Sequence, residues 1–92
     1  MTLEVQWTTK FKKDYKKLIK RRLDISKLDK VVTDLANRIQ LEAKYQDHPL
    51  SGNYEGFREC HIQPDWLLIY TIIESKLILT LSRTGTHSDL FN

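Results

Sequence analysis

One segment constrains the fold of this chain more than any other: Trp66–Ile73, in which Thr71 is the only residue that is not strongly apolar. Because the side chains of a strand alternate between two faces, an apolar run without alternation predicts a central strand covered on both faces. With 92 residues, the chain can build only a small core around such a strand. We therefore expect residues 1–92 to form one domain.

Shorter patterns on either side of this run predict the rest of the sheet. Leu3–Trp7 alternates apolar and polar side chains, and Lys76–Thr84 places Leu77, Leu79 and Leu81 on one side. The expected strands are residues 3–7, 54–62, 66–73 and 76–84, with turns at 63–65 and 74–75 and an ordered loop over 42–53. Gly85 ends the last strand, and one helical turn is expected over residues 86–91.

Two amphipathic helices are expected between the first two strands. Thr8 or Thr9 can cap the first, whose apolar stripe is Phe11, Tyr15, Leu18 and Ile19. Ser26 starts the second, with Asp29 in the capping-box position and an apolar stripe of Leu28, Val31, Val32, Leu35 and Ile39. The order β-α-α-β-β-β predicts an α+β fold with a mainly antiparallel sheet and a helical hairpin on one face.

Charge is distributed unevenly along the chain. Residues 1–40 contain 11 Lys and Arg against 5 Asp and Glu, a balance of +6, whereas residues 41–92 contain 4 against 7, a balance of −3. The densest basic stretch is Lys10–Arg22, where the candidate RNA contacts are Lys12, Lys13, Lys16 and Lys17. The same stretch is equally consistent with a solvated helix face, so both interpretations are kept.

Composition places the chain among soluble globular proteins. It is 40% hydrophobic and 29% charged, and no apolar run approaches the ~20 residues of a membrane span. Cys60 is the only cysteine, which excludes an internal disulfide and a cysteine-based zinc site. The first five residues lack the basic and apolar regions of a signal peptide, so we expect a cytoplasmic protein without a membrane partner.

All three histidines lie in short polar motifs at the edges of the expected strands. These motifs are Asp47-His48-Pro49-Leu50, Cys60-His61-Ile62-Gln63-Pro64-Asp65-Trp66 and Arg83-Thr84-Gly85-Thr86-His87. With an ordinary pKa of ~6.5, histidine can give or accept a proton near neutral pH. Antiparallel hairpins can bring the three motifs together, which predicts one acid–base site containing His48, His61, Asp65 and His87.

Such a set suits RNA cleavage, because the ribose 2′-hydroxyl is itself the nucleophile. A base removes its proton, an acid protonates the leaving 5′-oxygen, and a cation stabilises the phosphorane between them. Arginine can hold the phosphate through two hydrogen bonds, and an aromatic ring can hold an unstacked base. This chemistry requires no metal and no other cofactor.

Each candidate also has a purely structural interpretation: a surface loop for His48, a bond to a backbone carbonyl for His61, a cap for His87, a turn for Asp65, the core for Trp66 and an ion pair for Arg83. The three imidazoles and Asp65 can instead ligate zinc, although their spacing matches no zinc motif. Nucleophilic catalysis by Cys60 with His61 is weaker still, because neighbouring strand residues point to opposite faces.

Together these motifs resemble the RelE/ParE superfamily of bacterial toxins from type II toxin–antitoxin systems, and its YafQ branch most closely. The similarity covers nearly the whole chain. It includes the basic helical hairpin, residues 45–52 and 56–70, Arg83–His87, and Leu90 with Phe91. Other branches use lysine, arginine and tyrosine, so the histidine-rich set distinguishes this chain from them.

The resemblance implies a ribosome-dependent endoribonuclease that cuts mRNA in the decoding site and arrests translation. It implies catalytic roles for His48, His61, Asp65 and His87, with His87 or His61 near the leaving oxygen and Asp65 orienting an imidazole. RNA contacts are implied for Trp66, Arg83 and Phe91.

The resemblance also implies a cognate antitoxin that inhibits the toxin and, in complex with it, binds operator DNA. Two alternatives need the fold or the charge but not the histidines. One is a non-catalytic interaction toxin, like the gyrase-poisoning members of the superfamily, and the other is a plain basic RNA-binding module.

Overall fold

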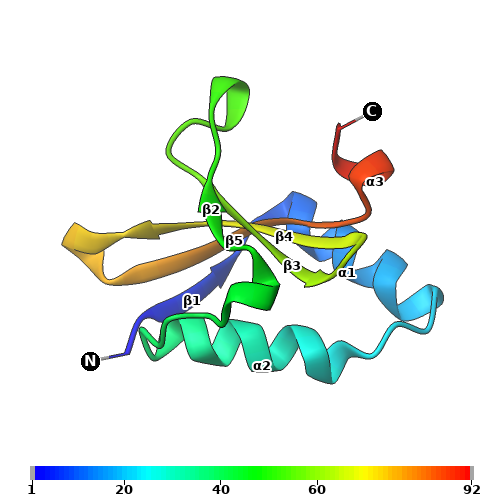
Figure 1. Cartoon of the computed structure of the whole chain (residues 1–92), viewed down its shortest axis with the longest axis horizontal. Coiled ribbons are helices and arrows are strands. Elements are labelled where there is room, and N and C mark those ends of the chain that lie inside the picture. The colour runs from blue at the N-terminus through cyan, green and yellow to red at the C-terminus, as the bar shows by residue number, and fades with distance from the viewer. Residues whose placement is uncertain (1, 92) are drawn as a thin grey trace.

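A five-stranded sheet forms the centre of the molecule in this computed structural model, which describes residues 2–91 (Figure 1). Met1 and Asn92, the two ends of the expected domain, lie outside the described residues. The strands are β1 (Glu4–Trp7), β2 (His48–Pro49), β3 (Arg58–Gln63), β4 (Trp66–Ile73) and β5 (Ile78–Gly85), in the spatial order β1-β5-β4-β3-β2. Only β1 and β5 are parallel, so the expected α+β class with a mainly antiparallel sheet is confirmed.

The main core lies between the sheet and the two longer helices, α1 (Thr9–Lys20) and α2 (Ile25–Ala36). Phe11 and Leu18 contribute from α1, and the apolar stripe of α2 contributes Leu28, Val31 and Leu35. Both helices therefore bury their apolar sides against one face of the sheet, as the patterning predicted. Among residues 2–91, no helix has the length and apolar content needed to cross a membrane.

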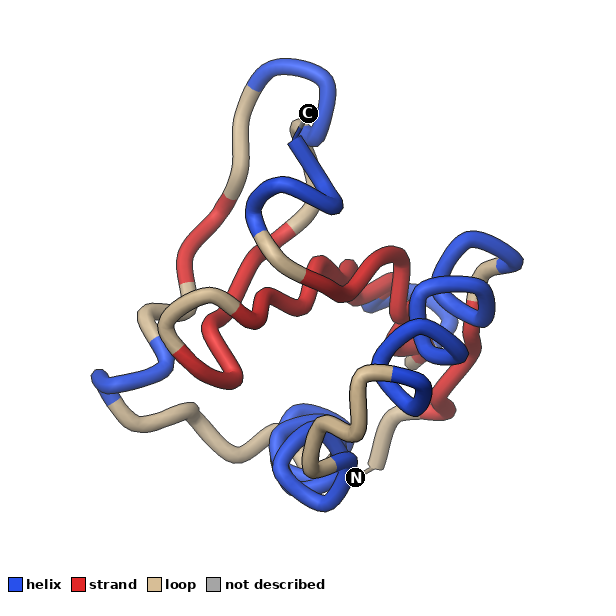
Figure 2. Tube along the Cα trace, turned by 90° about the vertical axis from the view of Figure 1, so that its right-hand side faces the viewer, coloured by secondary structure: helices blue, strands red, loops and turns tan. Residues whose placement is uncertain are grey.

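A second, smaller apolar cluster covers the opposite face of the sheet. Leu67 and Ile69 of β4 are fully buried there, beneath Leu90 of α3 (His87–Phe91) and residues of the segment between β2 and β3. Figures 1 and 2 show α3 and this segment rising from the side of the sheet that faces away from α2. The strand β4 is thus covered on both faces, which explains its unbroken apolar sequence.

The start and the end of α2 differ from the expected ones. Thr8 caps α1, accepting the backbone N–H of Phe11 at 3.0 Å, but Asp24 rather than Ser26 caps α2. Asp24 is the capping residue because its Oδ1 accepts the backbone N–H of Ser26 at 3.1 Å.

Two apolar residues that the sequence pattern assigned to the buried stripes of α1 and α2 are exposed. Ile39 lies beyond the end of α2. On α1, the side chain of Asp14 is buried, whereas that of Ile19 is exposed.

The strand boundaries differ where local turns interrupt the apolar alternation. β4 has its expected bounds, whereas β3 begins at Arg58 because a 3₁₀ turn over Gly52–Tyr54 precedes it and Gly56 has a φ of +89°. The strand β2 was not predicted, because two residues are too few to show the alternation of apolar and polar side chains that indicates a strand. The turn after β4 is also a 3₁₀ turn, Glu74–Lys76, so β5 starts at Ile78 and leaves Leu77 outside it.

Candidate active site

The three histidines lie together on the sheet face that carries α3. His48 of β2 pairs with Glu59 of β3, and His61 lies on the same face of β3 because it is two residues further along the strand. The ring centroids of His48 and His61 are 6.3 Å apart, and those of His61 and His87 are 5.8 Å apart. The fold therefore brings the three histidine motifs into one row.

Asp65 orients the ring of His87. It lies in the turn between β3 and β4, and its Oδ1 accepts the backbone N–H of His87 at 3.0 Å and lies 2.6 Å from His87 Nδ1. These two hydrogen bonds, the backbone one first, lower the pKa of the Asp65 carboxyl. Asp65 is therefore ionised at neutral pH and holds a proton on Nδ1 of His87, which leaves Nε2 of that ring free to exchange a proton.

Glu59 is the second acidic residue of the row besides Asp65, and it was not predicted. Its Oε1 lies 3.6 Å from His48 Nε2 and 3.5 Å from His61 Nε2, and its side chain is only 7% exposed. A carboxylate at these distances can pair with a protonated imidazole on either side. The sequence signal was available, because Glu59 and His61 occupy alternate positions of one strand and so share a face.

Backbone carbonyls set the orientation of the other two imidazoles. His48 Nδ1 lies 2.6 Å from the carbonyl oxygen of Gln46, and His61 Nδ1 lies 3.3 Å from that of Pro64. A carbonyl oxygen only accepts hydrogen bonds, so each Nδ1 carries a proton. In both rings Nε2 is then the nitrogen that gains or loses a proton, and in both it faces Glu59.

The short strand that carries His48 is held by a polar network on the preceding residue, Asp47. The hydroxyl of Tyr70 donates to Asp47 Oδ1 at 2.5 Å, and the Arg58 guanidinium contacts both carboxylate oxygens at 3.3–3.4 Å. Burial raises the pKa of the Tyr70 hydroxyl, so it keeps the proton that it donates. Two neighbouring strands thus fix the backbone next to a candidate catalytic imidazole.

Arg83 lies on the same face but is already paired. Its position in the row follows from the register His48–Glu59–Ile69–Arg83, which puts it two strands from Glu59, or about 10 Å away. Asp14 of α1 accepts Arg83 Nε at 2.7 Å and Nη2 at 3.2 Å. The hydrogen bond that Arg83 donates to Asp14 raises the pKa of Arg83. The ion pair offered as the structural interpretation of Arg83 is therefore formed, and its acidic partner comes from a helix.

The two predicted RNA-contacting aromatic residues have different environments. Trp66 is 3% exposed, belongs to the main core, and donates its indole N–H to Thr84 Oγ1 at 3.0 Å. This environment matches the structural interpretation of Trp66 as a core residue, and its contact with RNA stays a prediction. Phe91 is 47% exposed, and its ring centroid lies 5.8 Å from that of Tyr54, a residue that the sequence analysis assigned to a strand.

Two alternative chemistries do not fit the geometry. Within residues 2–91, no group of three or more His, Cys, Asp or Glu side chains is arranged to hold a metal ion, so the alternative in which the imidazoles and Asp65 ligate zinc has no ready set of ligands. Cys60 is buried in the main core, on the opposite face of β3 from His61, and burial raises the pKa of its thiol. It is a packing residue rather than a nucleophile.

Comparison with known proteins agrees with this arrangement. Residues 3–92 match the model of the family described as bacterial toxin of type II toxin–antitoxin system, YafQ. The chain belongs to this family. It is 40% identical to the mRNA interferase toxin YafQ of Escherichia coli K12 over 89 residues, which cover 96% of this chain and 95% of the relative. Membership confirms the resemblance drawn from the histidine motifs.

Solved structures of similar toxins share the whole fold. A crystal structure of the E. coli DinJ–YafQ toxin–antitoxin complex matches with a TM-score of 0.90, 39% identity and complete coverage of both chains. A metal-bound toxin from Helicobacter pylori matches with a TM-score of 0.91 and 47% identity, covering 97% of this chain and 99% of its own. The arrangement of helices and sheet is thus common to toxins of this family.

Proposed function

We propose that this toxin is an endoribonuclease that cuts mRNA on the ribosome by acid–base catalysis without a metal ion. Membership of the YafQ family makes the chain a toxin of a type II toxin–antitoxin system, and a curated relative is named an mRNA interferase. The observation that supports the proposed chemistry best is the row of three imidazoles with two carboxylates on one sheet face. A gyrase-directed toxin would not need that row.

Each imidazole has a role that its surroundings support. His87, paired with the Asp65 carboxylate, protonates the leaving 5′-oxygen. His48 or His61 removes the proton of the 2′-hydroxyl, and Glu59 stabilises the charged imidazole that results. Arg83, on the same face, contributes positive charge near the phosphate, and exposed Phe91 offers a ring to an unstacked base.

A cognate antitoxin is the expected protein partner of this toxin. A solved relative, E. coli YafQ, forms a toxin–antitoxin complex with DinJ. The antitoxin is expected to bind over or beside the histidine row with an acidic or mixed segment that folds on contact, because the toxin carries a net charge of +3. Operator DNA would be bound only through this complex, and the toxin would act in the cytoplasm, where translation takes place.

Mapping of mRNA ends after induction tests the proposed function. The toxin is expressed without its antitoxin, and new 5′ ends are sequenced across the transcriptome. We expect growth to stop, with ends appearing inside translated codons and disappearing when translation initiation is blocked. Arrest with intact mRNA and broken DNA would contradict the proposal and support the gyrase-directed alternative.

A further inference from the structure

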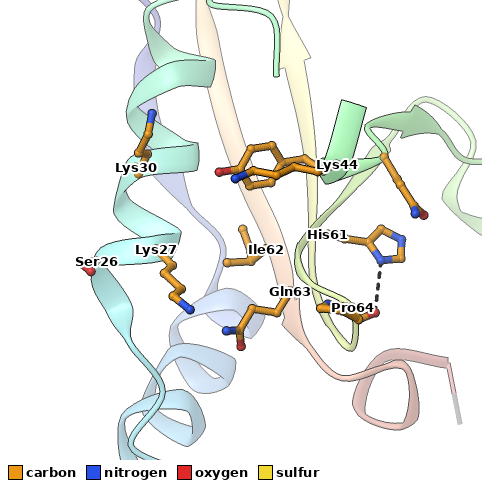
Figure 3. Close-up of a pocket in the computed structure, with 10 residues that line it drawn as sticks. Ser26, Lys27, Lys30, Lys44, His61, Ile62, Gln63 and Pro64 are labelled. Carbon is orange, nitrogen blue, oxygen red and sulfur yellow. Dashed lines mark hydrogen bonds between the residues drawn. The ribbon is translucent and has the colours of Figure 1, made fainter. Parts of the chain in front are cut away.

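A hollow between α2 and β3 lies close to the histidine row. It is an open groove of about 770 Å³, within the range of clefts that bind ligands. Figure 3 shows Lys27 extending from α2 toward the groove, Lys44 extending toward it from the opposite side, Ile62 between them, and Lys30 running along α2 at the upper end. We call this feature the lysine groove.

The lining of the lysine groove is positively charged. Its ten lining residues include three lysines and no aspartate or glutamate. Lys30 is paired with Asp34 at 2.9 Å, whereas Lys27 and Lys44 form no ion pair with another described residue. These two ammonium groups come from different elements and face one hollow, an arrangement that suits consecutive negative charges on a flexible chain.

The groove also offers contacts for nucleobases. Tyr45 lines it with a half-buried aromatic ring, over which Lys44 Nζ lies 5.2 Å from the centroid. Gln46 and Gln63 add two side-chain amides, which can donate to and accept from base edges. An aromatic ring beside ammonium groups is how single-stranded nucleic acid is held without strict sequence preference.

His61 connects the groove to the candidate active site. His61 is one of the residues that line the groove, and its ring extends to the other side of β3 from Ile62, where Nδ1 lies 3.3 Å from the carbonyl oxygen of Pro64 and Nε2 lies 3.5 Å from Glu59 (Figure 3). Because β2 pairs only with Arg58 and Glu59, a chain that leaves the groove can pass around the edge of β3 at residues 61–63 to reach the imidazoles on the other face. This continuity distinguishes the groove from the basic surface of α1, which carries lysines but no candidate catalytic residue.

We propose that the lysine groove binds the mRNA segment next to the scissile phosphate, with Lys27 and Lys44 each contacting one phosphodiester. The proposal rests on the proposed function, because it assumes that mRNA is the substrate. It assigns RNA contacts to residues outside both α1 and the histidine row. The groove holds the strand in place while the histidine row carries out the proton transfers.

The test measures binding of a short single-stranded RNA with 2′-O-methyl groups, which the toxin cannot cut because the nucleophile is blocked. Fluorescence anisotropy over a range of salt concentrations compares the wild type with Lys27→Gln/Lys44→Gln. Loss of two phosphate contacts should weaken binding roughly tenfold at low salt and reduce the salt slope by about 1.4. The control Lys76→Gln removes an exposed lysine outside the groove and should keep the wild-type slope. Thermal melting verifies that all variants fold.

A second measurement locates the strand on the ribosome. An mRNA that carries 4-thiouridine beside the cut site is cross-linked to bound toxin, and the linked peptides are identified by mass spectrometry. We expect peptides containing residues 26–30 or 44–46. Cross-links confined to other peptides, together with a wild-type salt slope in the double variant, would overturn the proposal.

Three other outcomes separate the possible causes. If the double variant lost affinity only for vacant ribosomes, the groove would bind ribosomal RNA and the mRNA assignment would be wrong. A loss of affinity for the antitoxin alone would make the groove a protein-binding site and would equally overturn the proposal. Wild-type toxin that left mRNA intact in the end-mapping experiment would instead contradict the proposed function itself.

Discussion

Glu59 is the residue whose placement is hardest to explain without a functional role. Its carboxylate is nearly buried, and burying a charge costs free energy unless the charge is paired. The groups beside it are the Nε2 atoms of His48 and His61, which are positively charged only when protonated. Glu59 therefore lies where its carboxylate can pair with whichever of the two imidazoles is protonated.

Replacing Glu59 with glutamine should slow cleavage more than it changes stability. The amide keeps the shape of the side chain but cannot pair with a charged imidazole, so a protonated ring loses its charge support. We expect the single-turnover rate on ribosomes to fall roughly 10- to 100-fold. Glu55→Gln, the same change at an exposed position of the preceding loop, is the control. Equal rates for the two variants would show that Glu59 has only a structural role.

Sequence reasoning grouped the candidate proton-transfer residues with Asp65 but missed Glu59 and Asp14, the acids that contact His48, His61 and Arg83. Histidine is scarce here and its chemistry is distinctive, so three motifs were enough to group His48, His61 and His87 with Asp65. Glu59 and Asp14 are ordinary acids in a chain that has twelve Asp and Glu residues. Their importance lies in burial and in partners distant along the chain, which depend on register and helix packing. The burial of Trp66 in the main core is likewise a tertiary property.

At the scale of elements, α1 and the residue that follows it hold the end of β5 and the helix α3 in place. Asp14 binds Arg83 and accepts the backbone N–H of Thr84 at 3.1 Å, which fixes the end of β5. Arg21, just after α1, pairs with Asp89 of α3 at 2.6 Å, and this pair holds the pKa of Asp89 well below its usual range. Gly85 lets Asp89 approach, since a Cβ there would lie 2.8 Å from Asp89 Oδ2.

Breaking the contact between α1 and β5 should impair catalysis through Arg83. In Asp14→Asn, Arg83 loses its counter-ion and its fixed orientation, so we expect slower cleavage and a loss of roughly 1–3 kcal/mol of stability. Asp29→Asn, an exposed acid on α2, is the matched control.

A double-mutant cycle with Arg83→Gln identifies the cause of the Asp14 effect. If Asp14 acts by positioning Arg83, Asp14→Asn should change the rate little further in the Arg83→Gln background. Additive effects on the logarithm of the rate would contradict this role and leave Asp14 as a stabilising residue only.

The accuracy of the expected elements follows the length of their sequence patterns. β4 was predicted with its full bounds because eight nearly unbroken apolar residues indicate a strand that is covered on both faces. The capping signal of α2 was ambiguous, since Asp24 and Ser26 both suit a helix start and only the hydrogen bond decides. β2 has two residues and forms because His48 and Pro49 pair with Glu59 and Arg58, so nothing local could predict it.

At the scale of the whole molecule, the two faces of the sheet differ in what covers them. One face is sealed by α1 and α2 over the main core, and the other carries the histidine row beside α3. The predicted RNA-contacting lysines of α1, Lys12, Lys13, Lys16 and Lys17, are all exposed. They are free to contact an external polyanion while Phe11 and Leu18 of the same helix hold the fold together.

Replacing these four lysines with glutamine should weaken ribosome binding without altering the fold. Each lost phosphate contact reduces the salt slope by about 0.7–0.9, so four contacts would produce a large and measurable change. Binding to ribosomes is measured by co-sedimentation over a salt series, with melting temperature as the control for folding. An unchanged slope would mean that these lysines form only a solvated helix face.

Single-turnover cleavage of mRNA on assembled ribosomes is the most direct test of the central claim. The toxin is treated with a chelator and freed of it before mixing, and the wild type is compared with His48→Ala, His61→Ala, His87→Ala and Asp65→Asn. A positioned acid or base contributes roughly 10²–10⁴ in rate, so each variant should be slower by that order while the chelated wild type stays active. Wild-type rates in all three histidine variants, or wild-type activity that returns only with added zinc, would contradict metal-free acid–base catalysis by the histidine row.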